Sequence, residues 1–203
     1  AGSTLFNELR KGVPRMSPTL LSKRLKDLEI AGVVERVAAG GPGAPGGYEY
    51  RLTAAGQELR PIIHAIGLWG QRWVETRNSL KNLDPSLLMW DVRRLLRPDG
   101  LRAGRTVVEF RFRRAPAGRS RFWLVVDRNA EPAVDLCLVD PGHEVDLQVT
   151  ADLRALTEVW MGDRTLRAAR DDGSVAIAGA GELDARFTTW FGPHPVLGGV
   201  ARA

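Results

Sequence analysis

The sequence predicts an α+β fold, with a winged helix-turn-helix followed by an antiparallel sheet covered by helices. Up to about residue 77, apolar residues recur at helical spacing around a single short strand pair. Beyond residue 84, several segments alternate apolar and polar residues at strand spacing, and further helices follow them. Residues 78–84 are polar and suit a linker. We therefore expect two domains, residues 1–77 and 84–203.

Composition and charge narrow the function classes. The 203 residues are 44% hydrophobic and 26% charged, which is typical of a soluble globular protein. No run approaches the roughly 18 apolar residues of a membrane span, and no N-terminal signal pattern is present, so a cytoplasmic location is expected. Residues 1–77 hold 11 Lys and Arg against 7 Asp and Glu. This basic excess suits a polyanionic partner such as DNA.

The helix expected at residues 17–31 carries the clearest binding pattern. Ser17 followed by Pro18 is a typical helix start, and Gly32 is a typical helix stop. One side is an apolar stripe formed by Leu21, Leu25 and Leu28. The polar residues expected at a DNA groove, on the other side or at the helix start, are Ser17, Thr19, Ser22, Lys23 and Lys26. Such a helix can rest on a core and enter a major groove, although the same lysines also suit an ordinary solvated face.

A strand pair and a long helix follow. Residues 33–37 and 48–52 read as two strands, joined by a Gly- and Pro-rich tip at 38–47 that has no Lys or Arg. Arg36 and Arg51, at the base of this wing, are therefore the expected phosphate contacts.

The helix expected at residues 53–75 begins at Thr53 and has more apolar residues than one small domain can cover. The residues expected to form a dimer interface are Ile62, Ile63, Ile66, Trp69 and Trp73. Burial of several such side chains can hold two copies together, so we predict a homodimer.

Motifs in this first part resemble those of the HxlR-type winged-helix regulators. They are Phe6-Asn7-Glu8-Leu9-Arg10, the segments 17–25 and 32–36, Tyr48-x-Tyr50-x-Leu52-Thr53-x-x-Gly56 and Trp69-Gly70. The resemblance covers roughly residues 4–75. It implies a homodimer on a pseudo-palindromic DNA operator, with 17–31 as the recognition helix and 33–52 as the wing. Members of this family usually have further helices before the first motif, so we expect one or more N-terminal helices to be missing from this sequence.

The second part reads as a sheet with helices. The expected strands are residues 106–113, 122–126, 134–139, 145–149 and 175–178. The expected helices are residues 86–96, 150–160 and 166–170, and a final helix containing Leu183, Phe187 and Trp190. Because consecutive strands are closely spaced, the sheet is predicted to be antiparallel.

Aromatic and aliphatic residues spread over this sheet and its helices suggest a ligand site. The candidates are Trp90, Trp123, Leu136, Leu156, Trp160, Phe187 and Trp190. They could line a lipophilic cavity between the layers or simply fill a core. The segments 122–126, 140–142, 151–153 and 160–163, with the Phe187-x-x-Trp190 helix, resemble the sterol-carrier-protein-2-like fold over residues 84–195. That resemblance implies a pocket for a small apolar molecule or lipid.

The sequence gives no pattern of catalysis. The three histidines, His64, His143 and His194, lack metal-ligand spacing, and no Gly-rich phosphate loop follows a strand. We therefore expect no enzyme activity, metal or cofactor. The function predicted is a DNA-binding regulator controlled by an apolar ligand in its C-terminal domain. The alternative is a lipid-carrier protein in which the winged helix serves only dimerisation.

Overall fold

The structure is a computed structural model that describes residues 4–39, 47–73, 83–115, 118–130, 132–179 and 181–195. The chain forms two compact units, residues 1–69 and 70–203. The expected linker, apart from Leu83 and Asp84, and most of the expected wing tip lie outside the described residues. No helix among the described residues has the length and apolar character needed to cross a bilayer.

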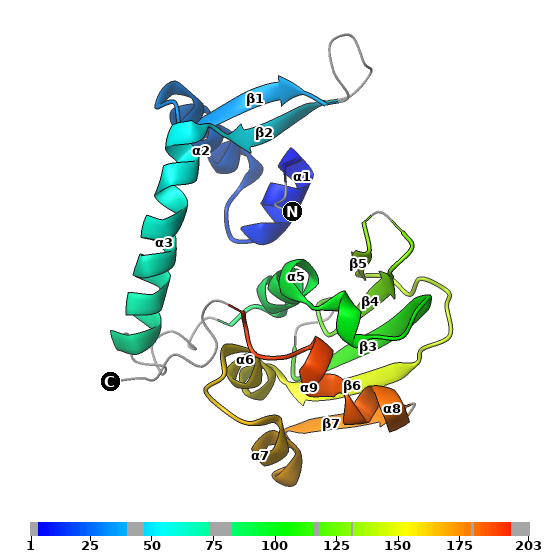
Figure 1. The fold of residues 1–203 in the computed structure, drawn as a ribbon. Coiled ribbons are helices and arrows are strands. Elements are labelled where there is room, and N and C mark those ends of the chain that lie inside the picture. Colours follow the sequence, from blue (N-terminus) through cyan, green and yellow to red (C-terminus); the bar gives the residue numbers. More distant parts are fainter. Residues whose placement is uncertain are drawn as a thin grey trace. The chain divides into compact units, whose positions relative to one another are not determined.

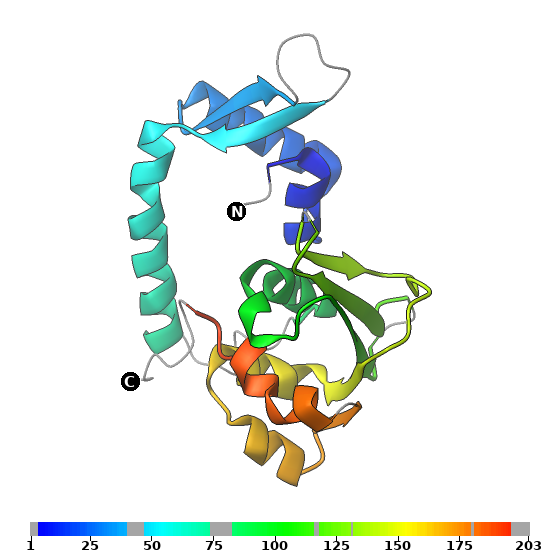
Figure 2. The ribbon, with the colours of Figure 1, turned by 45° about the vertical axis from the view of Figure 1, so that its right-hand side comes forward.

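The first unit is a winged helix-turn-helix, as predicted. Its elements in chain order are α1 (Phe6–Gly12), α2 (Pro18–Ile30), β1 (Val34–Ala38), β2 (Tyr48–Leu52) and α3 (Ala54–Trp73). The two strands form an antiparallel pair that lies beside α2, and α3 leads away from them (Figures 1 and 2). The last residues of α3 belong to the second unit.

The boundaries of α2 have the physical causes that the sequence suggested. The Ser17 hydroxyl accepts a hydrogen bond from the Leu20 amide at 3.2 Å, which satisfies a free amide of the first turn. Leu21 and Leu25 are buried on the inner side of the helix. The chain then turns at Gly32, whose φ of +69° lies in the left-handed region that glycine adopts without strain.

The start of α3 is fixed against the wing by Thr53 and Gly56. The Thr53 hydroxyl donates to the Gly32 carbonyl at 2.6 Å and accepts from the Gly56 amide at 3.1 Å. A Cβ on Gly56 would lie only 2.1 Å from the Val33 carbonyl oxygen, so this close approach requires glycine. Thr53 and Gly56 therefore set the direction in which α3 leaves the strand pair.

The second unit contains one five-stranded sheet. Its strands are β3 (Arg105–Arg113), β4 (Arg121–Asp127), β5 (Val134–Cys137), β6 (Leu147–Asp152) and β7 (Val175–Gly179). Their order is β5-β4-β3-β6-β7, so between β5 and β6 the chain crosses past β4 and β3. As a result β6 pairs parallel with β3, while the other three pairings are antiparallel. The expectation of an antiparallel sheet is thus wrong for this one pairing, because two consecutive strands that are close in the sequence, β5 and β6, are not neighbours in the sheet.

Helices and sheet enclose one hydrophobic core. The helical elements are α5 (Pro85–Leu95), η2 (Pro98–Gly100), α6 (Leu153–Met161), α7 (Leu166–Asp171), α8 (Gly181–Ala185) and α9 (Phe187–Trp190). Phe110 of β3, Leu124 of β4 and Val149 of β6 meet Met89 and Leu156 of the helices in this core. The α+β prediction is confirmed.

Two predicted helix boundaries in this unit are wrong. The helix expected from residue 150 starts at Leu153, because β6 continues to Asp152. The expected final helix consists of two short ones, α8 and α9.

The opposite face of the sheet holds a buried carboxylate. Glu109 is 2% exposed and accepts hydrogen bonds from Arg111 at 2.8 Å, from Arg121 Nε at 2.8 Å and from Gln148 at 3.0 Å. Burial alone would raise the pKa of this carboxyl, but the hydrogen bonds outweigh burial and lower the pKa from 4.5 to about 2.

This carboxylate should make the fold sensitive to acid. Because the pKa of Glu109 is lower in the folded state, ionised Glu109 stabilises the fold above pH 4.5, and this stabilisation is lost as the pH falls towards 2. At about 1.4 kcal/mol per pKa unit, the ionised carboxylate contributes about 3 kcal/mol to the free energy of unfolding. Chemical denaturation of the wild type and of Glu109→Gln should give unfolding free energies whose difference shrinks between pH 5 and pH 2.5, about the window set by this shift. A difference that stays constant over that range would contradict this assignment.

Candidate nucleic-acid interface

The outward side of α2 presents the polar residues that the sequence assigns to DNA. Thr19, Ser22, Lys23 and Lys26 are all exposed, whereas Leu21 and Leu25 on the opposite side are buried. Ser17 is also exposed, but its hydroxyl caps the helix. The helix is therefore held by its leucines and leaves a polar face open to a partner.

The charges on this helix differ in their availability. Arg24 lies 3.5 Å from the Asp27 carboxylate on the same helix. Within the described part of the chain, Lys23 and Lys26 make no ion pair. Two unpaired ammonium groups on one exposed helix face can bind phosphate or a base edge without first breaking a contact.

The wing arginines lie on opposite faces of the strand pair. Arg36 is paired across the strands with Tyr50, and Arg51 with Glu35, which puts the two arginines on different faces. The Arg36 guanidinium lies 4.2 Å from the Tyr48 ring centroid, and Arg51 lies 2.9 Å from the Glu49 carboxylate. One DNA backbone running along one face of the wing cannot contact both arginines equally. The sequence did not reveal this difference, nor the place of Tyr48 beneath Arg36.

The predicted dimer residues form an exposed apolar stripe on α3. Ile62, Ile66, Trp69 and Trp73 recur at i, i+4, i+7 and i+11, the spacing of one helix face, with Ile63 at its edge. All five are 54–61% exposed within the single chain. Large apolar side chains gathered in this way mark an interaction surface.

The predicted ligand residues do not all come together. Leu156, Trp160, Phe187 and Trp190 belong to the core, and Leu136 packs against it. Trp123 is paired with Glu109, which places it on the opposite face of the sheet beneath the Arg121 guanidinium. Trp90 is likewise buried outside this core cluster, with the Arg93 guanidinium 4.7 Å from its ring.

Aromatic rings fill the space beside α9. Phe187 and Trp190 pack edge to face with ring centroids 4.7 Å apart, and Trp160 meets Phe191 in the same way at 5.1 Å. The Trp160 indole donates to the Asp91 carboxylate at 2.9 Å. Sequence reasoning missed Phe191, although it lies four residues after Phe187 and so continues the helical spacing; the two rings stack with centroids 4.7 Å apart. The aromatic side chains beside α9 therefore pack against one another.

Comparison with known proteins places the first part of the chain in a family of regulators. Residues 1–78 match the HxlR-like helix-turn-helix family, and the chain belongs to this family. It is 40% identical over 74 residues to YvaP of Bacillus subtilis, described as an uncharacterized HTH-type transcriptional regulator, covering 36% of this chain and 67% of YvaP. It is 32% identical over 80 residues to YdeP of the same organism, covering 39% of this chain and 61% of YdeP.

These matches leave most of the chain outside the aligned region. The chain spans 53–67% of the length of three curated relatives, including one from Methanothermobacter thermautotrophicus. The winged helix-turn-helix is therefore assigned by family, whereas the activity of the whole protein is not.

Sterol carrier proteins are among the solved structures to which this chain is similar. The sterol carrier protein 2 like 2 of Aedes aegypti is 19% identical and covers 50% of this chain and 90% of its own, with a TM-score of 0.36. The sec-alkylsulfatase Pisa1 of Pseudomonas sp. is 16% identical and covers 57% of this chain and 16% of its own, with a TM-score of 0.42.

Proposed function

We propose that the protein is a DNA-binding transcriptional regulator that acts in the cytoplasm as a homodimer on a pseudo-palindromic operator. The observation that carries the proposal is the polar face of α2, where Thr19, Lys23 and Lys26 stand opposite two buried leucines. The apolar stripe on α3 supplies the dimer contact. Two copies of α2 would then enter major grooves one DNA turn apart, which matches a two-fold symmetric site.

We further propose that a small apolar molecule or lipid, held between sheet and helices of the second unit, controls DNA binding. Leu156, Trp160 and Trp190 lie buried between these two layers. A ligand has to part the aromatic pairs beside α9 to enter, so it changes the packing of these helices. Such a ligand shifts DNA affinity only through its different affinity for the free and DNA-bound states, typically by about 1–3 kcal/mol.

Selection from genomic DNA fragments tests the regulator directly. Repeated capture on the purified protein should enrich fragments that share an inverted repeat, since each protomer reads one half-site. Fragments without a common motif would favour the alternative, a lipid-carrier protein in which the winged helix serves only dimerisation.

Ligand control needs a separate experiment. Denatured protein is extracted with organic solvent, and mass spectrometry should detect a co-purified apolar compound. That compound is then titrated into the DNA-binding assay, where operator affinity should change. An extract without such a compound, or an unchanged operator affinity, counts against ligand control. Neither result bears on the proposal that the protein binds DNA.

A further inference from the structure

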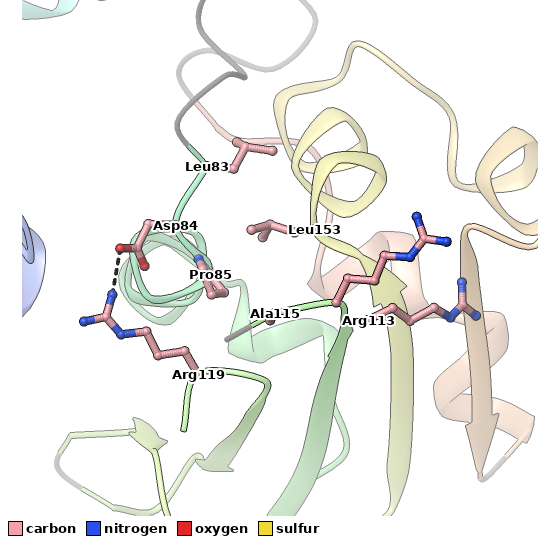
Figure 3. A pocket seen from close by; sticks show the side chains of 8 residues that line it. Leu83, Asp84, Pro85, Arg113, Ala115, Arg119 and Leu153 are labelled. Atoms are coloured by element: carbon pink, nitrogen blue, oxygen red, sulfur yellow. Dashed lines mark hydrogen bonds and ion pairs between the residues drawn. The ribbon is translucent and has the colours of Figure 1, made fainter. Parts of the chain in front are cut away.

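A pocket of about 230 Å³ lies in the second unit beside the start of α5 (Figure 3). Three chain segments and the start of α6 meet there: residues 83–85, residues 113–115 at the end of β3, and Arg119 just before β4. It contains none of the seven residues proposed above for the apolar ligand. It is also smaller than the roughly 300–1,000 Å³ of pockets that hold drug-sized ligands, so its occupant is small.

Four of the residues that line the pocket are charged, three of them arginines. Asp84 is already engaged, since its carboxylate caps α5 at the Ser86 amide at 2.8 Å and lies 3.3 Å from Arg119. Arg113 donates to the Gly173 carbonyl at 2.8 Å and lies 3.6 Å from the Asp152 carboxylate. The lining therefore carries one carboxylate and three guanidinium groups, and two of the three guanidinium groups are each paired with a carboxylate.

Arg114 differs from the other two arginines. Within the described residues it makes no hydrogen bond or ion pair, although it lines the pocket. Its φ of +57° is in the left-handed region, and no other described residue except glycine has a positive φ. A non-glycine residue held in this conformation carries a backbone cost, and such positions cluster at functional sites. Arg114 is thus a free guanidinium at a strained position on the pocket.

The remaining lining is apolar and comes from Leu83, Pro85, Ala115 and Leu153. In Figure 3 the Leu153 side chain lies between the Asp84–Arg119 pair on one side and Arg113 on the other. Guanidinium groups bind carboxylates in a planar, bidentate geometry, and an apolar wall accepts a hydrocarbon or aromatic body. A compact inorganic anion would leave that wall unused.

We propose that this pocket binds a small monocarboxylic acid with an apolar body, such as an aromatic acid, through the guanidinium of Arg114. This inference does not depend on the proposed DNA binding or on a ligand in the core. It identifies a second class of ligand for the same unit, at a site that the sequence patterns did not indicate.

Isothermal titration calorimetry of the full chain with benzoate tests this proposal. Benzoate should bind, and Arg114→Asn should weaken it at least about tenfold, or about 1.4 kcal/mol. Asparagine is the replacement of choice, because it tolerates the left-handed backbone and removes the guanidinium. Arg167→Asn is the matched control, since Arg167 is 92% exposed on α7 and does not line the pocket. The control should leave benzoate affinity unchanged.

Two further probes separate the parts of the proposal. Benzyl alcohol has the same ring without the charge and should bind at least about tenfold more weakly than benzoate, as should inorganic phosphate, which lacks the apolar body. No benzoate binding, or equal binding of benzyl alcohol, overturns the site. Phosphate binding as tight as that of benzoate overturns the apolar part, and an equal loss in Arg167→Asn shows a general charge effect instead.

Discussion

Replacing Lys23 and Lys26 together by alanine should weaken operator binding by about 30-fold or more. Each lysine lies on the exposed face of α2 and forms no ion pair with another described residue, so it can contact DNA without first breaking one. Loss of a base contact costs about 1–3 kcal/mol, and two such contacts give at least about 2 kcal/mol. If a lysine binds phosphate instead, its removal also lowers the salt dependence by about one unit of slope. Fluorescence anisotropy with the selected DNA over a salt series measures both quantities.

The matched control removes two positive charges elsewhere. Arg128 and Arg167 are both exposed in the second unit, and their combined replacement by alanine changes the net charge by the same amount. This control should retain nearly all of the operator affinity. If it loses as much as the lysine variant, the effect arises from overall charge. If the lysine variant keeps full affinity, α2 is not the DNA-reading helix.

Replacing Trp69 by aspartate should convert a dimer into a monomer. The wild type should scatter light as a particle of about twice the chain mass of 22.3 kDa. Burial of a large apolar side chain contributes roughly 1.5–3 kcal/mol, and each substitution acts twice across a two-fold axis. An unpaired carboxylate in the interface adds its own desolvation cost. The variant should therefore be monomeric at micromolar concentration and bind the inverted repeat more weakly.

The control for this experiment is Val139→Asp. Val139 is 78% exposed in the second unit, so the same type of change is made at a site with no proposed contact. This control should remain dimeric. A wild type that is already monomeric, or a Trp69→Asp variant that stays dimeric, contradicts the role of the α3 stripe.

The first unit could be predicted nearly in full because its signals are local. A cap at Ser17, a stop at Gly32 and leucines at helical spacing each act within a few residues, and the structure contains the cap and the stop. Of the predicted leucine stripe it buries Leu21 and Leu25, whereas Leu28 is 42% exposed. The close approach of Gly56 to Val33 also explains why a glycine occurs in the motif there. The faces of Arg36 and Arg51 follow from strand register, which the sequence pattern alone does not fix.

The second unit shows where sequence reasoning stops. The alternation of residues 106–113 predicts a strand with Val108, Phe110 and Phe112 on one face, and the structure has these three residues in the core. The alternation could not show that β6 pairs with β3, because pairing between distant strands depends on the whole sheet. For the same reason the sequence did not separate Trp123 from the other tryptophans. The arginine pocket was missed since its residues come from four separate segments.

The most direct test of the central claim compares two duplexes of equal length in one binding assay. One carries the inverted repeat obtained by selection, and the other carries the same bases in shuffled order. A regulator that reads sequence should bind the repeat about 10³-fold or more tightly than the shuffled duplex at physiological salt. Both affinities should fall as salt rises, since phosphate contacts release counterions. Equal affinity for the two duplexes, or no measurable binding of either at low salt, would contradict the account.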